Sequence, residues 1–134
     1  MKVLVVGGCG YIGALLVPQL IADGHKVTVY DTMWFGDGSL PKSNGHLKII
    51  KGDVRNTSQL RAACEGRDEV IYLASISNNA MYEKNYDLAN TVNSGSFPAA
   101  VVAAKESGVR RFIYASSVAG YGSDSIGTEG QTLY

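Results

Sequence analysis

Cysteine, histidine and net charge are all scarce in this sequence. The two cysteines, at positions 9 and 64, have no CxxC spacing and no histidine-rich neighbourhood, so we expect free thiols in a reducing cytoplasm and no metal site. Twelve basic residues balance twelve acidic ones, which excludes an overall field that would attract nucleic acid or an anionic membrane. No apolar run approaches the roughly 20 residues that a membrane-spanning helix needs. The composition, 46% hydrophobic and 18% charged over 134 residues, instead predicts one globular domain with a continuous core.

What the sequence does contain is a regular alternation of strand-like and helix-like segments. Strands that alternate with helices imply a parallel sheet covered on both faces. Right-handed crossovers then give a doubly wound α/β fold with five strands in the order 3-2-1-4-5. The fifth strand would lie at an apolar edge, so we expect a homo-oligomer that covers this strand or the long helix. The expected strands are 2–6, 26–31, 47–53, 69–74 and 111–115, and the expected helices are 11–23, a short one after Asn56, and 86–107.

Turn and capping residues mark the helix boundaries. Gly24 should end the first helix, in which Pro18 should introduce a kink or remove a hydrogen bond. Asn56 and Gln59 have the spacing of a capping box. Pro98 interrupts the long helix, so we expect a kink or a restart near Ser96. The residues expected to face the core are Ile12, Leu15, Leu16 and Leu20 in the first helix and Leu60, Ala63 and Cys64 in the second.

Glycine at every third position marks the turn between the first strand and the first helix. In the stretch VLVVGGCGYIG these glycines are Gly7, Gly10 and Gly13. A pyrophosphate can sit against the backbone N–H groups of such a helix start, and a Cβ would obstruct the turn, the phosphate or the contact between helix and strand. Glycine triplets also occur in ordinary tight turns. Here, however, a strand precedes the turn and a helix follows it, which is the context that a dinucleotide site requires.

Two aspartates end the second and third strands. Asp31, eighteen residues after Gly13, lies where a carboxylate can accept hydrogen bonds from the ribose of adenosine. Its charge would repel a 2′-phosphate, which favours NAD over NADP. Asp53 could accept from the adenine amino group while Val54 packs on the ring. The alternative for either aspartate is a structural role as a turn or helix cap.

The motifs GGCGYIG, GDV, YLASIS, TVNSG and YASSVAGYG occur in this order, with Asp31 between the first two. This set resembles the amino-terminal part of an extended short-chain dehydrogenase/reductase. The likeness is greatest to the NAD-dependent sugar-nucleotide epimerases and dehydratases, and it covers essentially the whole chain. It implies a Rossmann domain that binds NAD over residues 1–134, incomplete relative to the family and truncated before the substrate domain, with residues 116–134 as a substrate-side loop.

Residue roles follow from this resemblance position by position. Asn93 matches the helix asparagine that braces the active-site side of the sheet, and Ser117, four residues before Tyr121, matches the catalytic Ser or Thr. Its neighbour Ser116 could be a strand-end cap. Tyr72 stands where the family usually has histidine, which we interpret as drift in a wall residue. The cofactor-binding residues implied in this way are Gly7, Gly10, Tyr11, Ile12, Gly13, Asp31, Asp53, Val54, Leu73, Ala74, Ser75 and Asn93.

The resemblance also points to a missing pair of residues. Similar enzymes use a Tyr and a Lys four residues apart, because a phenol is a poor base for the substrate's hydroxyl proton unless a nearby ammonium lowers its pKa. None of the eight tyrosines here has lysine four residues later, and the family position lies beyond residue 134. Tyr134 is early for this role, although a shortened loop could make it the base.

The sequence is therefore compatible with three interpretations. The chain could be the NAD-binding portion of a nucleotide-sugar epimerase or dehydratase, in which the full-length enzyme binds the nucleotide sugar and transfers a hydride at a sugar carbon. It could instead be a stand-alone dinucleotide-binding module without catalysis. A structural relic that binds no dinucleotide is a third possibility. The unfinished loop and the apolar edge favour the first, whereas the identity of the sugar and the choice between epimerisation, dehydration and reduction cannot be predicted.

Overall fold

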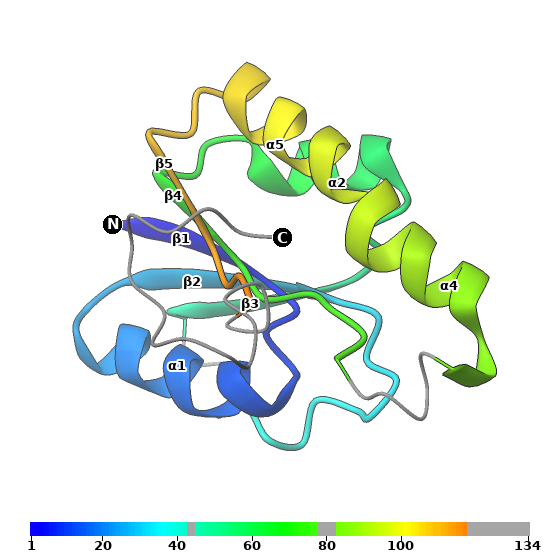
Figure 1. The fold of residues 1–134 in the computed structure, drawn as a ribbon. Coiled ribbons are helices and arrows are strands. Elements are labelled where there is room, and N and C mark those ends of the chain that lie inside the picture. Colours follow the sequence, from blue (N-terminus) through cyan, green and yellow to red (C-terminus); the bar gives the residue numbers. More distant parts are fainter. Residues whose placement is uncertain (43–44, 78–82, 118–134) are drawn as a thin grey trace, which may run out of the picture.

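The computed structural model describes residues 1–42, 45–77 and 83–117, which form one parallel five-stranded sheet with helices on both faces (Figure 1). The strand order is β3-β2-β1-β4-β5, so the predicted doubly wound fold and its strand order are confirmed. The third and fourth strands end two residues earlier than predicted. The strands are β1 Lys2–Val6, β2 Lys26–Asp31, β3 Leu47–Lys51, β4 Glu69–Tyr72 and β5 Arg111–Tyr114.

The helices divide between the two faces of the sheet. Figure 1 shows α1 on one face and α2, α4 and α5 together on the other, as right-handed crossovers require. A π-helical turn, η1, joins α4 to α5. The helices are α1 Tyr11–Ala22, α2 Thr57–Cys64, α4 Tyr86–Asn90, η1 Thr91–Gly95 and α5 Phe97–Glu106.

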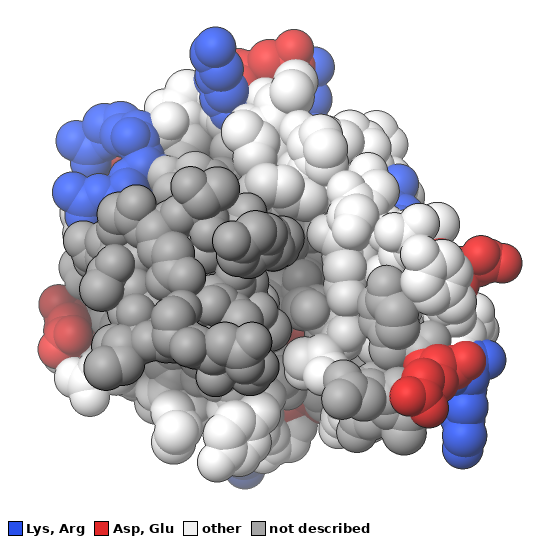
Figure 2. All heavy atoms as spheres, viewed as in Figure 1, with Lys and Arg blue, Asp and Glu red and all other residues white. Residues whose placement is uncertain are grey.

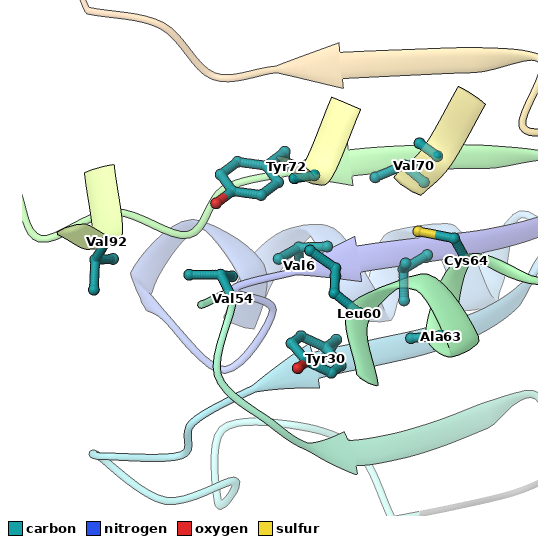
Figure 3. Close-up of a cluster of buried hydrophobic side chains, with 12 residues drawn as sticks. Val6, Tyr30, Val54, Leu60, Ala63, Cys64, Val70, Tyr72 and Val92 are labelled. Carbon is teal, nitrogen blue, oxygen red and sulfur yellow. The ribbon is translucent and has the colours of Figure 1, made fainter. Parts of the chain in front are cut away.

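Alternating residues of the central strand β1 supply two separate hydrophobic cores. Val3 and Val5 pack with Val17 of α1 on one face. Leu4 and Val6 pack with residues of α2 and α5 on the other face, where Figure 3 shows this cluster. These four β1 residues are at most 1% exposed. Because side chains of a strand point alternately to opposite faces, a continuous run of apolar residues is what a sheet buried on both sides needs.

The predicted orientation of α1 is wrong in part. Ile12 and Leu15 are 56% and 74% exposed, whereas Gly13 and Val17 form the buried face of the helix. The reason is the close approach of α1 to the strand-to-helix turn, because the bare Cα of Gly13 rests on the backbone of Gly8. The apolar pattern alone did not predict that Gly13 would face the core. Leu16 and Leu20, by contrast, are half-buried, in agreement with the prediction that they face the core.

The predicted helix boundaries agree largely with the structure. The helix α1 runs through Pro18 to Ala22, and Gly24 follows with a φ of +82°. In the long helical region the α-helix turns into η1 and restarts at Phe97, with Pro98 in the first turn of α5. Proline is tolerated there because its missing N–H falls among donors that have no partner inside the helix.

The predicted capping box at α2 is half formed. The Asn56 side chain accepts from the Gln59 backbone N–H at 3.1 Å, as predicted. The Gln59 side chain does not return to the Asn56 N–H, which donates instead to the Asp53 carbonyl at 2.9 Å. The Gln59 side-chain amide donates to the Lys51 carbonyl instead. The three residues predicted to face inward from α2, Leu60, Ala63 and Cys64, are buried.

The edge strand β5 is the most exposed strand of the sheet. Within residues 1–42, 45–77 and 83–117 it pairs only with β4, and Ile113 and Tyr114 are 42% and 48% exposed. The homo-oligomer expected at this edge remains a prediction. On the face shown in Figure 2, positive and negative side chains lie at the periphery in small groups. In the described part of the chain, no helix has both the length and the apolar character needed to cross a membrane.

Candidate functional site

A cleft of about 600 Å³ opens where the strands end, and each of the five strands sends its following residues into it. This is the edge at which open α/β sheets bind ligands. The residues that follow β3 and β4, from Gly52 and Leu73 onward, line the cleft. The N–H groups of Gly52 and Leu73 still donate to the neighbouring strands, to the carbonyls of Asp31 and Val6. The cleft brings together all twelve residues predicted to bind the cofactor and also Ser117; these are Gly7, Gly10, Tyr11, Ile12, Gly13, Asp31, Asp53, Val54, Leu73, Ala74, Ser75, Asn93 and Ser117.

The glycine turn is built by close contacts that a side chain would block. Gly7 has a φ of +82° and donates its N–H to the Tyr30 carbonyl at 2.8 Å. A Cβ on Gly7 would lie 2.6 Å from the backbone nitrogen of Ala74, and one on Gly13 would overlap the backbone of Gly8. The turn is therefore fixed between β2, the residues after β4, and α1.

The N-terminus of α1 faces the cleft without a capping side chain. Gly10 occupies the N-cap position, and the first turn contains no acidic residue. The first N–H groups of any helix lack partners within the helix, and the helix dipole favours an anion there. Gly10, Tyr11, Ile12 and Gly13 all line the cleft at this point. The site therefore fits a pyrophosphate group.

Asp31 has the structural role that we considered as its alternative. One carboxylate oxygen accepts from the Cys9 N–H at 3.0 Å, and the other accepts from the Met33 N–H at 2.7 Å. Met33 has a φ of 57°, so the chain turns sharply just after the aspartate. Each carboxylate oxygen has two acceptor positions, and one of each pair remains. Asp31 can thus hold the glycine turn and still accept hydrogen bonds from a ligand in the cleft.

The Asp53 carboxylate accepts three hydrogen bonds from Arg55, two residues further along the chain. The Arg55 backbone N–H and Nε each donate to Asp53 Oδ1 at 2.9 Å, and Arg55 Nη2 donates to Oδ2. These hydrogen bonds lower the pKa of the Asp53 carboxyl, so the group is ionised at neutral pH. Val54 is buried beside it and also lines the cleft.

Asn93 links η1 to the loop after β4. Its amide oxygen accepts from the Ile76 N–H at 2.8 Å, and its amide nitrogen donates to the Ile76 carbonyl at 3.0 Å. The Ser75 hydroxyl donates to the same amide oxygen at 3.4 Å. A π-helical turn widens the helix locally and is frequent at functional sites. Asn93 thereby holds the cleft-lining loop as a neighbouring strand would.

Ser116 and Ser117 lie directly beyond β5 and line the cleft, where both are exposed. The two tyrosines discussed with them, Tyr121 and Tyr134, lie outside the described residues, as does most of the loop expected at 116–134. Within the described residues, no group of three or more His, Cys, Asp or Glu side chains could hold a metal ion.

Tyr72 is not a wall of the cleft, contrary to our interpretation. It is 1% exposed, and its ring stacks on Phe112 with 5.9 Å between centroids. Its hydroxyl lies 3.0 Å from Ser96 Oγ, which itself donates to the Val92 carbonyl in η1. A tyrosine at this position is therefore a core residue that steadies the π-helical turn.

Sequence reasoning missed three exposed aromatic residues of the cleft, namely Tyr114 at the end of β5 and two residues that follow β2. Trp34 and Phe35, in the loop after β2, are 50% and 85% exposed and line the cleft. The sequence position of Trp34 and Phe35 could have indicated them, because they follow Asp31 closely, in a loop after the carboxyl end of a strand. Trp34 is also the only tryptophan in the chain.

The fold should lose stability at alkaline pH because it contains two buried thiols, those of Cys9 and Cys64. Burial, together with the Asp31 charge, raises the pKa of Cys9 from 9.0 to about 11, and burial raises that of Cys64 to about 11 as well. The folded chain holds these protons more tightly than the unfolded chain does, so stability is complete below pH 9 and falls as the pH rises toward 11. We expect Tm to decrease by several degrees over this interval, as measured by circular dichroism.

A Cys64→Ala variant is the matched test of this cause, because it removes one of the two titrating thiols. Its Tm should depend less steeply on pH above 9 than that of the unchanged chain. Equal slopes for the two proteins would show that ionisation of Cys64 plays no part in the alkaline loss of stability.

The comparisons with known proteins agree with the fold and the cleft. The model of the 3-beta hydroxysteroid dehydrogenase/isomerase family matches residues 4–131. A 3 beta-hydroxysteroid dehydrogenase/Delta 5→4-isomerase of Mycobacterium tuberculosis is 31% identical over 120 residues, which cover 87% of this chain and 31% of that protein. A UDP-glucose 4-epimerase of Corynebacterium glutamicum is 26% identical over 94% of this chain and 38% of its own length. The chain therefore spans about a third of the length of these relatives.

Solved structures show the same relationship. The dTDP-glucose 4,6-dehydratase of Streptomyces venezuelae, with NAD bound, superposes on the whole chain with a TM-score of 0.90 and 25% identity, over 45% of its own length. A UDP-N-acetylglucosamine 4-epimerase of Methanobrevibacter ruminantium gives a TM-score of 0.88 and 28% identity over 99% of this chain and 44% of its own. The resemblance to sugar-nucleotide epimerases and dehydratases is thus confirmed. The family match over residues 4–131 shows that the chain belongs to the 3-beta hydroxysteroid dehydrogenase/isomerase family.

Proposed function

We propose that this chain is the NAD-binding portion of an oxidoreductase that acts on a secondary alcohol of a nucleotide sugar. The observation that carries the proposal is the single cleft that gathers the glycine turn, Asp31, Asp53 and Ser117. A solved relative, the dTDP-glucose 4,6-dehydratase, holds NAD. When bound, NAD supplies a reversible hydride acceptor for the alcohol carbon.

Different residues of the cleft would bind different parts of NAD. The glycine turn and the N-terminus of α1 would hold the pyrophosphate, and the remaining acceptor positions of Asp31 would receive the ribose hydroxyls. No lysine or arginine lines the described part of the cleft, so a 2′-phosphate would meet the Asp31 charge without a compensating cation. This supports NAD over NADP.

Ser117 would contact the substrate rather than the adenosine end. It follows β5, whereas Asp31 is the last residue of β2 on the other side of the cleft, and both line the cleft. A hydroxyl at this place can orient the reacting alcohol by a hydrogen bond. The proton itself must pass to a stronger base, and the Tyr and Lys that similar enzymes use for it are not paired in this sequence.

A steroid alcohol is the second candidate substrate. The matching family model and the relative from Mycobacterium tuberculosis are both described as 3-beta hydroxysteroid dehydrogenases. Oxidation of a 3β-hydroxyl and oxidation of a sugar hydroxyl both remove a hydride from a carbon that bears a secondary alcohol. The dinucleotide-binding portion is therefore compatible with either substrate.

The gene sequence beyond codon 134 would test whether this portion belongs to an enzyme. A following helix with the pattern Tyr-x-x-x-Lys would support an enzyme, whereas a stop codon would support a stand-alone module.

Titration with NADH tests the proposed cofactor directly. Trp34, the only tryptophan, lines the cleft, so bound NADH should quench its fluorescence and accept energy from it. We expect saturable quenching by NADH and at least tenfold weaker binding of NADPH. The folded state should be verified by circular dichroism in the same buffer. A flat titration of the folded chain would contradict the proposal and favour a structural relic.

A further inference from the structure

We infer that Tyr30 is a positioning residue, which fixes Asp53 at the adenine end of the cleft and so sets the selectivity for a purine with a 6-amino group. The inference rests on the proposed NAD function. Tyr30 belongs to β2, has no exposed surface although it borders the cleft, and was not among the residues that the sequence singled out.

Tyr30 holds the chain on both sides of Asp53. Its hydroxyl lies 2.8 Å from the Asp53 carbonyl oxygen and 3.1 Å from Gln59 Oε1, and it can donate to either. Gln59 Nε2 in turn donates to the Lys51 carbonyl at 3.1 Å. The backbone carbonyls of residues 51 and 53 are thus tied to one buried hydroxyl and its partner amide.

Gly52 sits directly on the Tyr30 ring between these two carbonyls. A Cβ at this position would overlap the ring carbons and the hydroxyl oxygen. The ring also belongs to the core cluster that contains residues of α2, and Figure 3 shows it close to Leu60. The path of the chain from β3 into the cleft is therefore set by the position of one aromatic ring.

Asp53 has little freedom to compensate for a shift in this path. A carboxylate offers about four acceptor positions, and Arg55 occupies three of them, two on Oδ1 and one on Oδ2. One acceptor position remains, on Oδ2. Because Arg55 belongs to the same short segment, it moves with Asp53 and cannot correct a displacement. The anchoring of the backbone by Tyr30 therefore decides where the remaining acceptor points.

The test compares NADH with reduced nicotinamide hypoxanthine dinucleotide, in which an oxygen replaces the 6-amino group of adenine. If Asp53 accepts from that amino group, the unchanged chain should bind NADH about tenfold more tightly, since a hydrogen bond to a charged group has about that effect on affinity. In Tyr30→Phe the ring remains on Gly52 but the hydroxyl is lost. We expect this ratio of affinities to fall by about threefold or more.

Tyr72→Phe is the matched control. Tyr72 is also a buried tyrosine with a hydroxyl partner, Ser96, and it does not line the cleft. It should lower Tm and leave the ratio unchanged, because a loss of stability weakens the binding of both dinucleotides equally. A ratio that stays the same in Tyr30→Phe, or that falls equally in both variants, would overturn the inference.

Further outcomes separate the inference from the proposed function. If the unchanged chain binds neither dinucleotide, the proposed function fails. If it binds both equally, NAD binding stands and the inference is overturned, because no contact with the amino group exists. Should Tyr30→Phe fail to fold, Gln59→Met decides, since it removes the tie between Tyr30 and the Lys51 carbonyl. Tyr30 keeps its hydrogen bond to the Asp53 carbonyl in that variant. A lower ratio would therefore support the inference, and an unchanged ratio would overturn the part of it that assigns anchoring to Gln59 and the Lys51 carbonyl.

Discussion

Gly7→Ala should destabilise the chain far more than Gly24→Ala, although both glycines have a φ of +82°. The left-handed backbone costs alanine about 1 kcal/mol at either site. A Cβ at Gly24 meets nothing within 4 Å, whereas one at Gly7 lies 2.6 Å from the Ala74 nitrogen. Overpacking against backbone adds about 1–3 kcal/mol. Urea unfolding measured by circular dichroism should therefore separate the two variants by about that amount.

The same pair of variants should differ in binding. A displacement of Gly7 moves both the glycine turn and the Ala74 backbone, which line the cleft on either side. We expect NADH affinity to fall by about 100-fold in Gly7→Ala, as a geometric error at a phosphate site would cause, and to stay unchanged in Gly24→Ala. Equal losses of stability and of affinity in the two variants would mean that φ alone, and not the close contact, explains the need for glycine at position 7.

The sheet and the position of the cleft were predictable because local patterns determine them. Runs of valine and isoleucine alternate with helical segments, which predicts a parallel sheet with right-handed crossovers. The glycine-rich turn after the first strand then favours the strand order of dinucleotide-binding folds. The cleft follows from that order, since parallel strands all end at one edge. No knowledge of side-chain contacts was needed for these predictions, and the residues after each strand could be assigned to the site from sequence position alone.

The orientation of α1 could not be predicted in the same way. Apolar periodicity predicts Ile12 and Leu15 as core residues. It does not take into account that a glycine, which has no side chain, lets the helix pack most closely on the neighbouring backbone. Gly13 is the point at which α1 approaches the turn, and this rotates Ile12 toward the cleft. A helix packed through glycine buries its smallest residue, so the apolar pattern is misleading where the turn is functional.

Tyr30 and Tyr72 illustrate a second limit. Both are apolar strand residues in the sequence, and both use a buried hydroxyl to hold a segment far away in the chain, Asp53 in one case and Ser96 in the other. Such partners depend on the packing of α2 and α5 on the sheet, which the sequence pattern does not specify in atomic detail. A buried tyrosine among valines nonetheless suggests a hydrogen-bond partner, because its hydroxyl rarely remains unpaired.

Asp31→Ala should weaken NADH binding by about 10- to 100-fold and reduce the preference for NADH over NADPH. The first effect follows from the loss of charged acceptors for the ribose hydroxyls. The second follows because the repulsion of a 2′-phosphate disappears with the carboxylate. Asp31 also ties Cys9 to Met33, so the variant should lose stability in addition.

Asp68→Ala separates these two contributions. Asp68 also accepts a backbone N–H from the chain at β1, that of Lys2 at 2.7 Å, but it does so at the opposite end of the strand and does not line the cleft. We expect it to change Tm without altering the ratio of NADH to NADPH affinity. Asp31→Asn, which keeps one amide oxygen as an acceptor and removes the charge, should still lose part of the cofactor preference. If Asp31→Ala lowers the affinities for both cofactors equally, Asp31 acts only through the turn that it holds, and the discrimination against a 2′-phosphate lies elsewhere in the cleft.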